Sequence, residues 1–435
     1  MKHKKQKKAF LLILLSLIFI PGLEVLLMIG FNSGSLIRLP IFIAIIVLIV
    51  LFTLLLVIEL KIYYKAKKKN KDKIKTWIKA FLTIFMIIYV SGCITFVVLL
   101  YGPNEKFKTW LITTAMSTMN HQYLCKWFYS EEQINEILDN NYVLESGEST
   151  DVTLIKKHNY KYRKDEYESD YEREILDVDD DIDYQIIEFE VNDCIAHLAV
   201  IYDPSKVRVE VTEYLGVKGQ YVTTMAERND AIIGINGGGF YDPGNMSAGG
   251  TPTGITIKNG EIITNGEYGT DTQSGGIIGF TDDDILVLLK NATAEEAINM
   301  GVRDAVSWGP FLIVNGEPSF IRGNGGWGYA ARSDIGQRED GIVLLLVVDS
   351  NSTRTKGADM IDLVEIMQNY GAINAANLDG GTSSVMVMPK DIAIDDYDAP
   401  CTDYYTDNYC AINDPIDGGL YHRTRPIADA WIVDQ

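Results

Sequence analysis

The chain has 435 residues, with 39 basic and 59 acidic side chains, a net charge of −20 and 47% hydrophobic residues. Residues 1–101 carry 15 Lys and Arg against 3 Asp and Glu, a balance of +12, so the remainder carries −32. This asymmetry excludes a single soluble domain. The acidic remainder would repel phosphate backbones, which excludes a nucleic-acid binder, and the hydrophobic content excludes a disordered chain.

Three apolar stretches in residues 1–101 predict transmembrane helices, because each has about 20 residues, enough to cross a hydrocarbon layer of roughly 30 Å. They are Ala9–Gly30, Leu39–Ile58 and Ala80–Leu100. Five lysines precede the first stretch and nine lie in Lys61–Lys79. Because positive charge stays cytoplasmic, we expect a cytoplasmic N-terminus and place everything after Tyr101 outside the cytoplasm. The sequence therefore predicts a multi-pass cell-membrane protein that contacts the lipid bilayer through three helices.

Residues 102–183 are expected to form membrane-proximal helices and an acidic linker. The apolar pattern of Asn104–Asn140 is helical, and Ser130 followed by Gln133 is typical of a capping box. Glu145–Asp183 is charged, Tyr-rich and poorly periodic, which favours a solvated linker over a calcium site.

Residues 184–435 show short β-branched runs divided by turn residues, which predict strands. The runs are Gln185–Val191, Ile195–Tyr202, Lys206–Val211, Ala231–Ile235, Gly254–Ile257, Gly276–Phe280, Ile285–Leu289, Phe311–Val314 and Gly341–Val348. Helical patterns occur at Thr293–Met300 and Met360–Tyr370. We infer an α+β domain with a strand-rich mixed sheet and a few helices. The predicted domains are therefore 1–101, 102–183 and 184–435.

Of the five cysteines, Cys93 lies in a predicted span, so four lie outside the cytoplasm and permit three pairings. Cys401 and Cys410 flank a short loop and are the preferred disulfide. Nothing in the cysteine spacing indicates zinc or a catalytic thiol.

Two glycine-rich segments concentrate residues suited to chemistry. Residues 234–280 hold 14 of the 37 glycines, and Asn236 is followed by Gly237–Gly239 directly after a predicted strand. Consecutive glycines leave N–H groups uncovered, which favours an anion-binding nest, with a tight turn as the alternative. In the second segment, Asp379 is followed by two glycines, a threonine, Ser383 and Ser384. A carboxylate among small polar residues suits an acid, a base or a ligand.

Arginines near these segments could bind phosphate, since the planar guanidinium binds its oxygens bidentately. Those that follow the first glycine segment in the acidic domain include Arg332, Arg338, Arg354, Arg423 and Arg425. Each could equally be a surface ion-pair partner.

Five motifs resemble, in order, those of the phosphodiester glycosidase family, which contains N-acetylglucosamine-1-phosphodiester alpha-N-acetylglucosaminidase. They are Asn236–Asp242, Pro252–Gly254, Trp308–Ile313, Arg332–Gln337 and Asn377–Ser384. The resemblance covers about Tyr184–Gln435 and is closest to bacterial, membrane-anchored members of exopolysaccharide type. Two departures bear on substrate choice: Asp334 adds a carboxylate, and Asn351 stands where the family tends to have arginine.

The resemblance implies roles for individual residues. Arg332 and the Gly237–Gly239 backbone would bind the phosphate, and Asp379 would act as base or nucleophile, with Asp349 as the alternative. The expected substrate-binding residues are Asn236, Gly237, Gly238, Gly239, Arg354, Ser383, Ser384 and Arg425.

The resemblance also implies a function: an extracytoplasmic glycosidase that hydrolyses a sugar-1-phosphodiester bond in a cell-envelope or exopolysaccharide glycan. The alternatives are a non-catalytic binder of phosphate-linked wall polymers and a glycosyl-phosphate transferase in polysaccharide assembly. The expected partner is a phosphate-containing glycan, and no cofactor is required. Calcium could bind the oxygen ligands of Asp242, Asp282–Asp284 or Asp395–Asp396, but solvated turns are the simpler interpretation.

Overall fold

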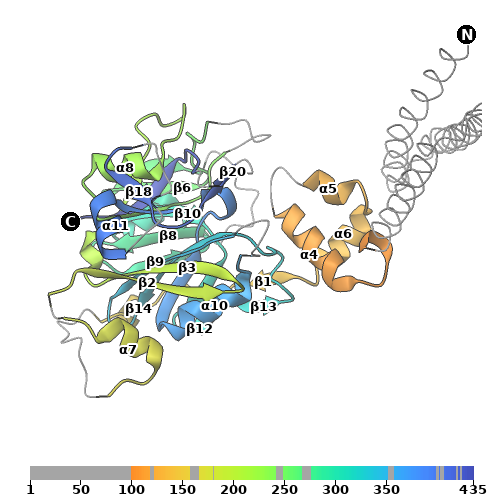
Figure 1. The fold of residues 1–435 in the computed structure, drawn as a ribbon, viewed down its shortest axis with the longest axis horizontal. Helices are drawn as coiled ribbons and strands as arrows, with labels where there is room; N and C mark the ends of the chain where they lie inside the picture. Colours follow the sequence, from red (N-terminus) through yellow and green to blue (C-terminus); the bar gives the residue numbers. More distant parts are fainter. Residues whose placement is uncertain are drawn as a thin grey trace, which may run out of the picture. The chain divides into compact units, whose positions relative to one another are not determined.

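The fold is taken from a computed structural model. It describes residues 99–117, 122–156, 166–179, 181–241, 248–266, 276–350, 357–397, 401, 406–417, 420–421 and 424–435. The chain divides into two compact units, Met1–Asp139 and Asn140–Gln435 (Figure 1). The predicted domain boundaries after residues 101 and 183 rest on composition and remain a prediction.

The predicted transmembrane helices at residues 9–30 and 39–58 lie outside the described residues, and so does the one at 80–100 except for residues 99 and 100. Within the part of the chain that the structure describes, no helix combines the length and the apolar character needed to cross a membrane.

The described part of the first unit includes the short helices α4 (Glu105–Met116), α5 (Gln122–Lys126) and α6 (Glu131–Leu138). Their apolar side chains form a small core that includes Ile112 and Cys125, both fully buried. The predicted capping box is confirmed: Ser130 Oγ accepts from the Gln133 N–H at 3.2 Å, and Gln133 Oε1 accepts from the Ser130 N–H at 3.1 Å.

The second unit is built on three sheets, which confirms the α+β, strand-rich prediction (Figure 1). The largest, of seven strands, has the order β12 (Glu317–Pro318), β11 (Phe311–Val314), β16 (Ala372–Asn377), β14 (Arg332–Arg338), β15 (Val343–Val348), β3 (Cys194–Ile201) and β2 (Tyr184–Val191).

Two five-stranded sheets belong to the same unit, and its described residues also form two smaller sheets of two strands each. One has the order β18 (Tyr409–Ala411), β17 (Met386–Pro389), β5 (Ile233–Asn236), β21 (Asp429–Val433) and β4 (Val207–Val211). The other has the order β7 (Glu261–Asn265), β6 (Ile255–Lys258), β10 (Val302–Trp308), β8 (Gly276–Thr281) and β9 (Leu286–Leu289).

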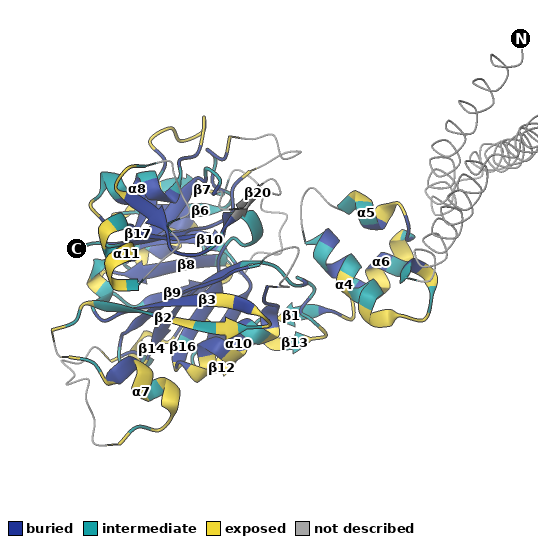
Figure 2. Ribbon diagram, in the orientation of Figure 1, coloured by how far each residue is buried: buried dark blue, intermediate teal, exposed yellow. Residues whose placement is uncertain are grey.

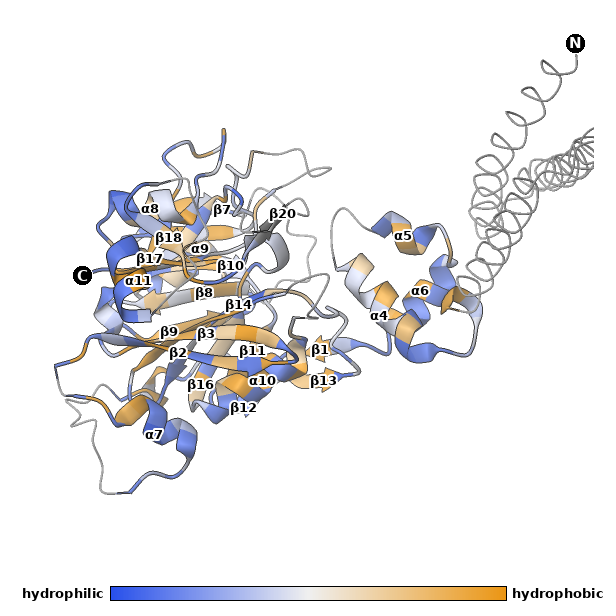
Figure 3. Cartoon of the chain, in the orientation of Figure 1, coloured by the Kyte–Doolittle hydropathy of each residue, from blue (hydrophilic) through white to orange (hydrophobic). Residues whose placement is uncertain are grey.

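The three sheets share one apolar core, because residues from each contribute to a single buried cluster. Ile335 of β14, Trp431 of β21 and Phe280 of β8 are all fully buried in it. Strands at this core are dark blue in Figure 2 and largely hydrophobic in Figure 3. The sheets are thereby held as one body, and the loops at their strand ends are positioned by it.

Helices cover the outer faces. Helix α10 (Met360–Asn369) packs its buried side chains against the seven-stranded sheet, and α8 (Val222–Arg228) packs against β5 and β17. Helix α9 (Ala294–Asn299) packs against β6, β7 and β10, and α11 (Lys390–Tyr397) against β17 and β18. The predicted helices at 293–300 and 360–370 therefore correspond to α9 and α10.

Part of Glu145–Asp183, the segment that we expected to be a solvated linker, is folded. Just before it, strand β1 (Tyr142–Leu144) pairs with β13 (Phe320–Arg322). Within it, Thr150 Oγ1 accepts a hydrogen bond of 2.8 Å from the Leu288 N–H. Helix α7 (Asp170–Leu176) buries Ile175 and Leu176 in the cluster behind the seven-stranded sheet. The linker prediction was wrong here because these few apolar residues are too sparse to show a period.

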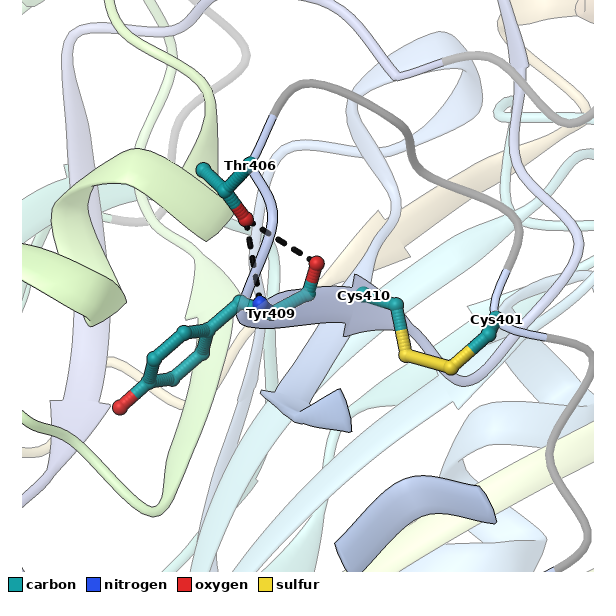
Figure 4. Close-up of a disulfide and its surroundings, with 4 residues drawn as sticks. All are labelled: Cys401, Thr406, Tyr409 and Cys410. Atoms are coloured by element: carbon teal, nitrogen blue, oxygen red, sulfur yellow. Dashed lines mark hydrogen bonds between the residues drawn. A yellow bond between two sulfur atoms is a disulfide. The ribbon is translucent and has the colours of Figure 1, made fainter. Parts of the chain in front are cut away.

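Cys401 and Cys410 form the predicted disulfide, beside the strand β18 (Figure 4). Next to it, Thr406 Oγ1 donates to the Tyr409 carbonyl oxygen at 3.0 Å and accepts from the Tyr409 N–H at 3.2 Å. Cys125 and Cys194 are buried thiols.

Candidate active site

The site is organised by β14, the strand between β15 and β16 in the seven-stranded sheet. Arg332 begins this strand opposite Val348 of β15, and Asp334 lies opposite Asn377 of β16. Every residue of β14 is buried, although most of them are polar. The strand therefore places charged and polar groups inside the protein, where their interactions are strong.

The first glycine motif follows β5 as a turn that faces β21. The N–H of Gly237 donates to the carbonyl oxygen of Asp429 at 3.1 Å, and the N–H of Gly238 donates to Asp429 Oδ1 at 2.8 Å. A Cβ at Gly237 would collide with the same Oδ1. Two of the N–H groups that we expected to bind phosphate, those of Gly237 and Gly238, are therefore engaged by Asp429 of the protein itself.

Asp379 follows β16 and meets the glycine turn. Its N–H donates to the carbonyl oxygen of Gly237 at 3.2 Å, and its own carbonyl oxygen accepts a 2.6 Å bond from Asn236 Nδ2. Its carboxylate accepts hydrogen bonds from the hydroxyl of Ser383 and the N–H of Gly380. The two predicted motifs are therefore brought together by direct contacts.

The carboxyl group of Asp379 has a pKa close to neutral pH. Burial raises its pKa to about 6, opposed by the Ser383 hydrogen bond, the charge of Arg425, the Gly380 N–H and the charge of Arg332. The residue as a whole is partly exposed by surface area. A carboxylate that exchanges a proton near pH 6 suits a general base or a nucleophile.

Two arginines act on Asp379, and each lies against an aromatic ring. The guanidinium of Arg332 lies 6.0 Å from the centre of the Trp327 ring, and that of Arg425 lies 4.6 Å from the Phe240 ring. Arg425 Nη1 also donates to Thr382 Oγ1 at 3.2 Å. These contacts hold two positive charges at the Asp379 loop.

Arg332 is almost completely buried, at 4% exposure. Its Nε donates to the carbonyl oxygen of Ala358 at 3.2 Å, and its Nη2 donates to those of Trp327 and Gly328 at 2.9 and 2.8 Å. Burial lowers its pKa to about 10, while the charges of Asp334, Asp359 and Asp379 raise it. A Cβ at Gly380 would lie 3.4 Å from Nη1, so this nitrogen is beside the Asp379 loop.

Asn236, expected to orient sugar hydroxyls, is fully buried and is engaged within the protein. Its Oδ1 accepts from Ser333 Oγ at 2.7 Å and from the Val385 N–H at 3.1 Å, while its Nδ2 serves Asp379. It therefore ties β5, β14 and the Asp379 loop together, and a positioning role fits these contacts better than substrate contact.

Asp349, the alternative to Asp379, directly follows β15 and is 8% exposed. Its carboxylate accepts from Asn413 Nδ2 at 2.8 Å and from the Asp414 N–H at 3.0 Å. Burial raises its pKa to about 6, opposed by these two hydrogen bonds. Because neither arginine contributes to its pKa, Asp349 is less well placed for phosphate chemistry than Asp379.

Asp334, the departure from the family pattern, is buried with no exposed surface. Within the described structure, neither of its carboxylate oxygens has a hydrogen-bond partner, and the same holds for Oδ1 of the opposing Asn377. Burial raises the pKa of Asp334 well above its usual value, against the charge of Arg332. Burial thus favours the protonated form of this acid, which lies on the strand that also carries Arg332.

The remaining predicted residues divide into four groups. Ser383 contacts Asp379, and Ser384 is buried nearby with an Oγ that has no hydrogen-bond partner in the described structure. Gly239 packs against the Trp308 ring. Arg354, Arg423 and Asp242 lie outside the described residues. Arg338 pairs with Asp340 at 2.9 Å, as a structural ion pair.

Metal ligands were left open by the sequence. In the described ranges, no group of three or more His, Cys, Asp or Glu side chains is arranged to hold a metal ion.

Three site residues escaped the sequence analysis. Asp429 is a lone acid in an apolar strand pattern, and Trp327 is a lone aromatic in a glycine-rich loop, so neither carries a motif. Phe240 belongs to a motif but gave no sign of contact with an arginine. A search of the sequence for single acidic residues within apolar strand patterns could have found Asp429.

Residues 229–434 match the family model for phosphodiester glycosidase. This range holds Asn236, the glycine turn, Arg332, Asp379 and Asp429. The family assignment of the domain rests on this match.

Individual proteins are also similar to the chain. The SPbeta prophage-derived uncharacterized protein YomE of Bacillus subtilis is 28% identical over 189 residues, which span 42% of this chain and 28% of that protein. The auto-inhibited catalytic domain of zebrafish N-acetylglucosamine-1-phosphodiester alpha-N-acetylglucosaminidase aligns at 17% identity over 58% of this chain and 83% of its own, with a TM-score of 0.43. A hypothetical protein from Synechocystis aligns at 15% identity over 57% and 62%, with a TM-score of 0.34.

Proposed function

Because the chain carries a phosphodiester glycosidase domain at residues 229–434, we propose that it hydrolyses a sugar-1-phosphodiester bond. The observation that supports this most directly is the charge arrangement at Asp379. A half-buried carboxylate with a pKa near 6 is acted on by two arginines, as a substrate with a phosphate beside an anomeric carbon requires.

The bond broken is that between the anomeric carbon and a phosphate oxygen. The electron pair leaves with the phosphate, positive charge develops on the sugar, and water supplies the new oxygen. Because a phosphomonoester leaves readily, a cation beside it is more useful than a strong general acid.

Arg332 and Arg425 are assigned to the phosphate and Asp379 to the anomeric carbon. As a base, Asp379 takes the proton of the attacking water; as a nucleophile, it forms a glycosyl ester that water then cleaves. The N–H groups of Gly237 and Gly238 are engaged by Asp429, so the arginines carry the phosphate role in this proposal.

The substrate class follows from the predicted topology. With three transmembrane helices and an extracytoplasmic domain, the enzyme would meet a phosphate-linked glycan of the cell envelope or an exopolysaccharide. Both the membrane anchor and the glycan are part of the proposal, supported by the apolar stretches and lysine distribution of residues 1–101.

The test uses the full-length protein in detergent with a panel of sugar-1-phosphodiesters, and free reducing sugar is the readout. Release of sugar and phosphomonoester in equal amounts supports hydrolysis. Transfer of the sugar to an added glycan acceptor would indicate a transferase, and binding without release over long incubation would indicate a binding protein. Either result contradicts the proposal.

A further inference from the structure

We infer that Asp429 is a positioning residue for Asp379, acting through the glycine turn between them. This inference rests on the proposed function, because it assigns a supporting residue to the same site. Asp429 is 1% exposed and has no route to a substrate, so its effect must pass through the groups that it contacts.

Hydrogen bonds connect the two aspartates step by step. Asp429 Oδ2 accepts from Thr256 Oγ1 at 3.2 Å, and Oδ1 accepts from the Gly238 N–H at 2.8 Å. The preceding residue, Gly237, donates its N–H to the Asp429 main chain and accepts from the Asp379 N–H through its carbonyl oxygen. The glycine turn is therefore hydrogen-bonded to Asp429 on one side and to the main chain of Asp379 on the other.

The glycines are required by this arrangement. A Cβ at Gly237 would occupy the position of Asp429 Oδ1, and one at Gly239 would collide with the Trp308 ring. The turn can approach the carboxylate closely because Gly237 has no side chain.

The charged groups around Asp429 leave it without a counter-ion. In the described part of the chain, no cation lies within ion-pair distance of it. On the neighbouring strands, Lys258 pairs with Glu210 at 2.7 Å, and Asp304 pairs with Arg303. Burial raises the pKa of Asp429 to about 7, against the hydrogen bonds from Gly238 and Thr256, and the charge of Asp379 adds to the increase. Above that pH, a second negative charge develops behind the phosphate site.

Two variants separate the hydrogen bonds of Asp429 from its charge. Asp429→Ala removes the acceptor for the Gly238 N–H, whereas Asp429→Asn keeps an acceptor oxygen and can donate to Thr256 Oγ1. We expect Asp429→Ala to lower kcat by about 10- to 100-fold, because small displacements of a reacting group are costly. Asp429→Asn should restore kcat to within about threefold of wild type.

The matched control is Asp304→Ala. Asp304 is also a 1% exposed aspartate, and it also accepts a backbone N–H, that of Asn259 at 3.2 Å, but it lies outside the site. Its loss should destabilise the protein without lowering kcat per folded molecule. Equal losses of kcat in Asp429→Ala and Asp429→Asn, or full kcat in Asp429→Ala, would overturn the inference.

The pH profile gives a second readout that a purely structural role would not move. In wild type, KM should rise above about pH 7 as Asp429 ionises, and this rise should be absent in Asp429→Asn. An unchanged rise in the variant counts against the inference.

Thermal unfolding separates this inference from the proposed function. Because the folded-state pKa of Asp429 is about 7 and its usual value is 3.8, wild type loses stability as pH rises between these values. The difference between the Tm of Asp429→Asn and that of wild type should therefore shift in favour of the variant as pH rises from 4 to 7. A constant difference would contradict the buried arrangement. Wild type that releases no sugar would contradict only the proposed function.

Discussion

The side chain of Asn236 donates a 2.6 Å hydrogen bond to the main-chain oxygen of Asp379. This contact joins the end of β5 to the loop after β16, two segments that are far apart in the sequence. Two motifs that each seemed weak thus prove to be parts of one site, and the position of Asp379 depends on both.

Asp379 is predicted to be essential for turnover. We expect Asp379→Asn to lower kcat by about 10³-fold, the scale of a lost general base, while the fold is retained. Sugar release and thermal unfolding are the measurements. Asp282→Asn, a change at an exposed aspartate, is the control and should leave both sugar release and thermal unfolding unchanged. Turnover that survives in Asp379→Asn would remove this residue from the chemistry.

The rate should depend on pH with an acid limb near pH 6. The reactive form of Asp379 is ionised and its pKa is about 6, so kcat/KM should rise as pH increases through 6 and fall about tenfold per unit below it. Asp349 has a similar pKa, so Asp349→Asn is the decisive comparison. If the limb disappears in this variant while activity remains, Asp349 is the titrating group.

Arg425 is predicted to contribute to phosphate binding. We expect Arg425→Gln to raise KM for a phosphodiester by about tenfold, the effect of one lost charge-assisted contact. Because the Arg425 charge lowers the pKa of Asp379, the acid limb should also move to higher pH. Arg208→Gln is the control, since Arg208 pairs with Asp434 at 2.8 Å. A variant with unchanged KM and unchanged limb would show that Arg425 is structural.

Asp334 is predicted to limit stability at high pH. Its folded-state pKa is raised well above 3.8, so the unfolding free energy of the protein decreases as pH increases and the unfolded state ionises more readily. In Asp334→Asn, the new amide can donate to the unpartnered Oδ1 of Asn377, and we expect a gain of about 1–3 kcal/mol at pH 8 that shrinks toward pH 4. Urea unfolding across this range is the measurement. A variant less stable than wild type at pH 8 would mean that Asp334 is ionised and stabilises Arg332.

The Cys401–Cys410 disulfide is predicted to stabilise the domain. The two residues are nine positions apart, and closing a loop of this size contributes about 2–3 kcal/mol by the chain-entropy model. Cys401→Ser should lower the unfolding free energy by this amount, and a reducing agent should lower that of wild type equally but leave Cys401→Ser unchanged. Cys194→Ser, a change at a free thiol, keeps the disulfide and should lose the same amount on reduction as wild type.

Strands with continuous β-branched or aliphatic runs were predictable from the sequence. The bounds of β11, Phe311–Val314, match the prediction, and those of α9 and α10 match within a residue. In these segments the side chains that pack the core are themselves apolar, so the pattern in the sequence reflects the burial.

The central strand β14 was not predicted, because its residues are polar. Ser333 donates to Asn236, and Gln337 accepts from the Leu286 N–H at 2.6 Å while its Nε2 donates to two carbonyl oxygens. Partners that come from other elements satisfy these side chains. Hydrophobic periodicity cannot report burial of this kind.

The sequence predicted which residues belong to the site better than it predicted what each of them does. Asp379, Arg332, Arg425 and Ser383 are brought together as expected, while Asn236, Gly237 and Gly238 prove to be engaged within the protein. The sequence could not show that the glycine turn binds the Asp429 side chain, because the two segments are far apart in the chain and only the fold brings them together.

The three residue pairs between β1 and β13 have a mechanical consequence. Strand β1 begins at Tyr142, directly after the boundary between the two units, so tension on the chain from the N-terminal unit reaches this short ladder before any other strand. Force applied along the chain from that side would therefore break the β1–β13 pairing first. The seven-stranded sheet that carries Arg332 would be loaded only afterwards.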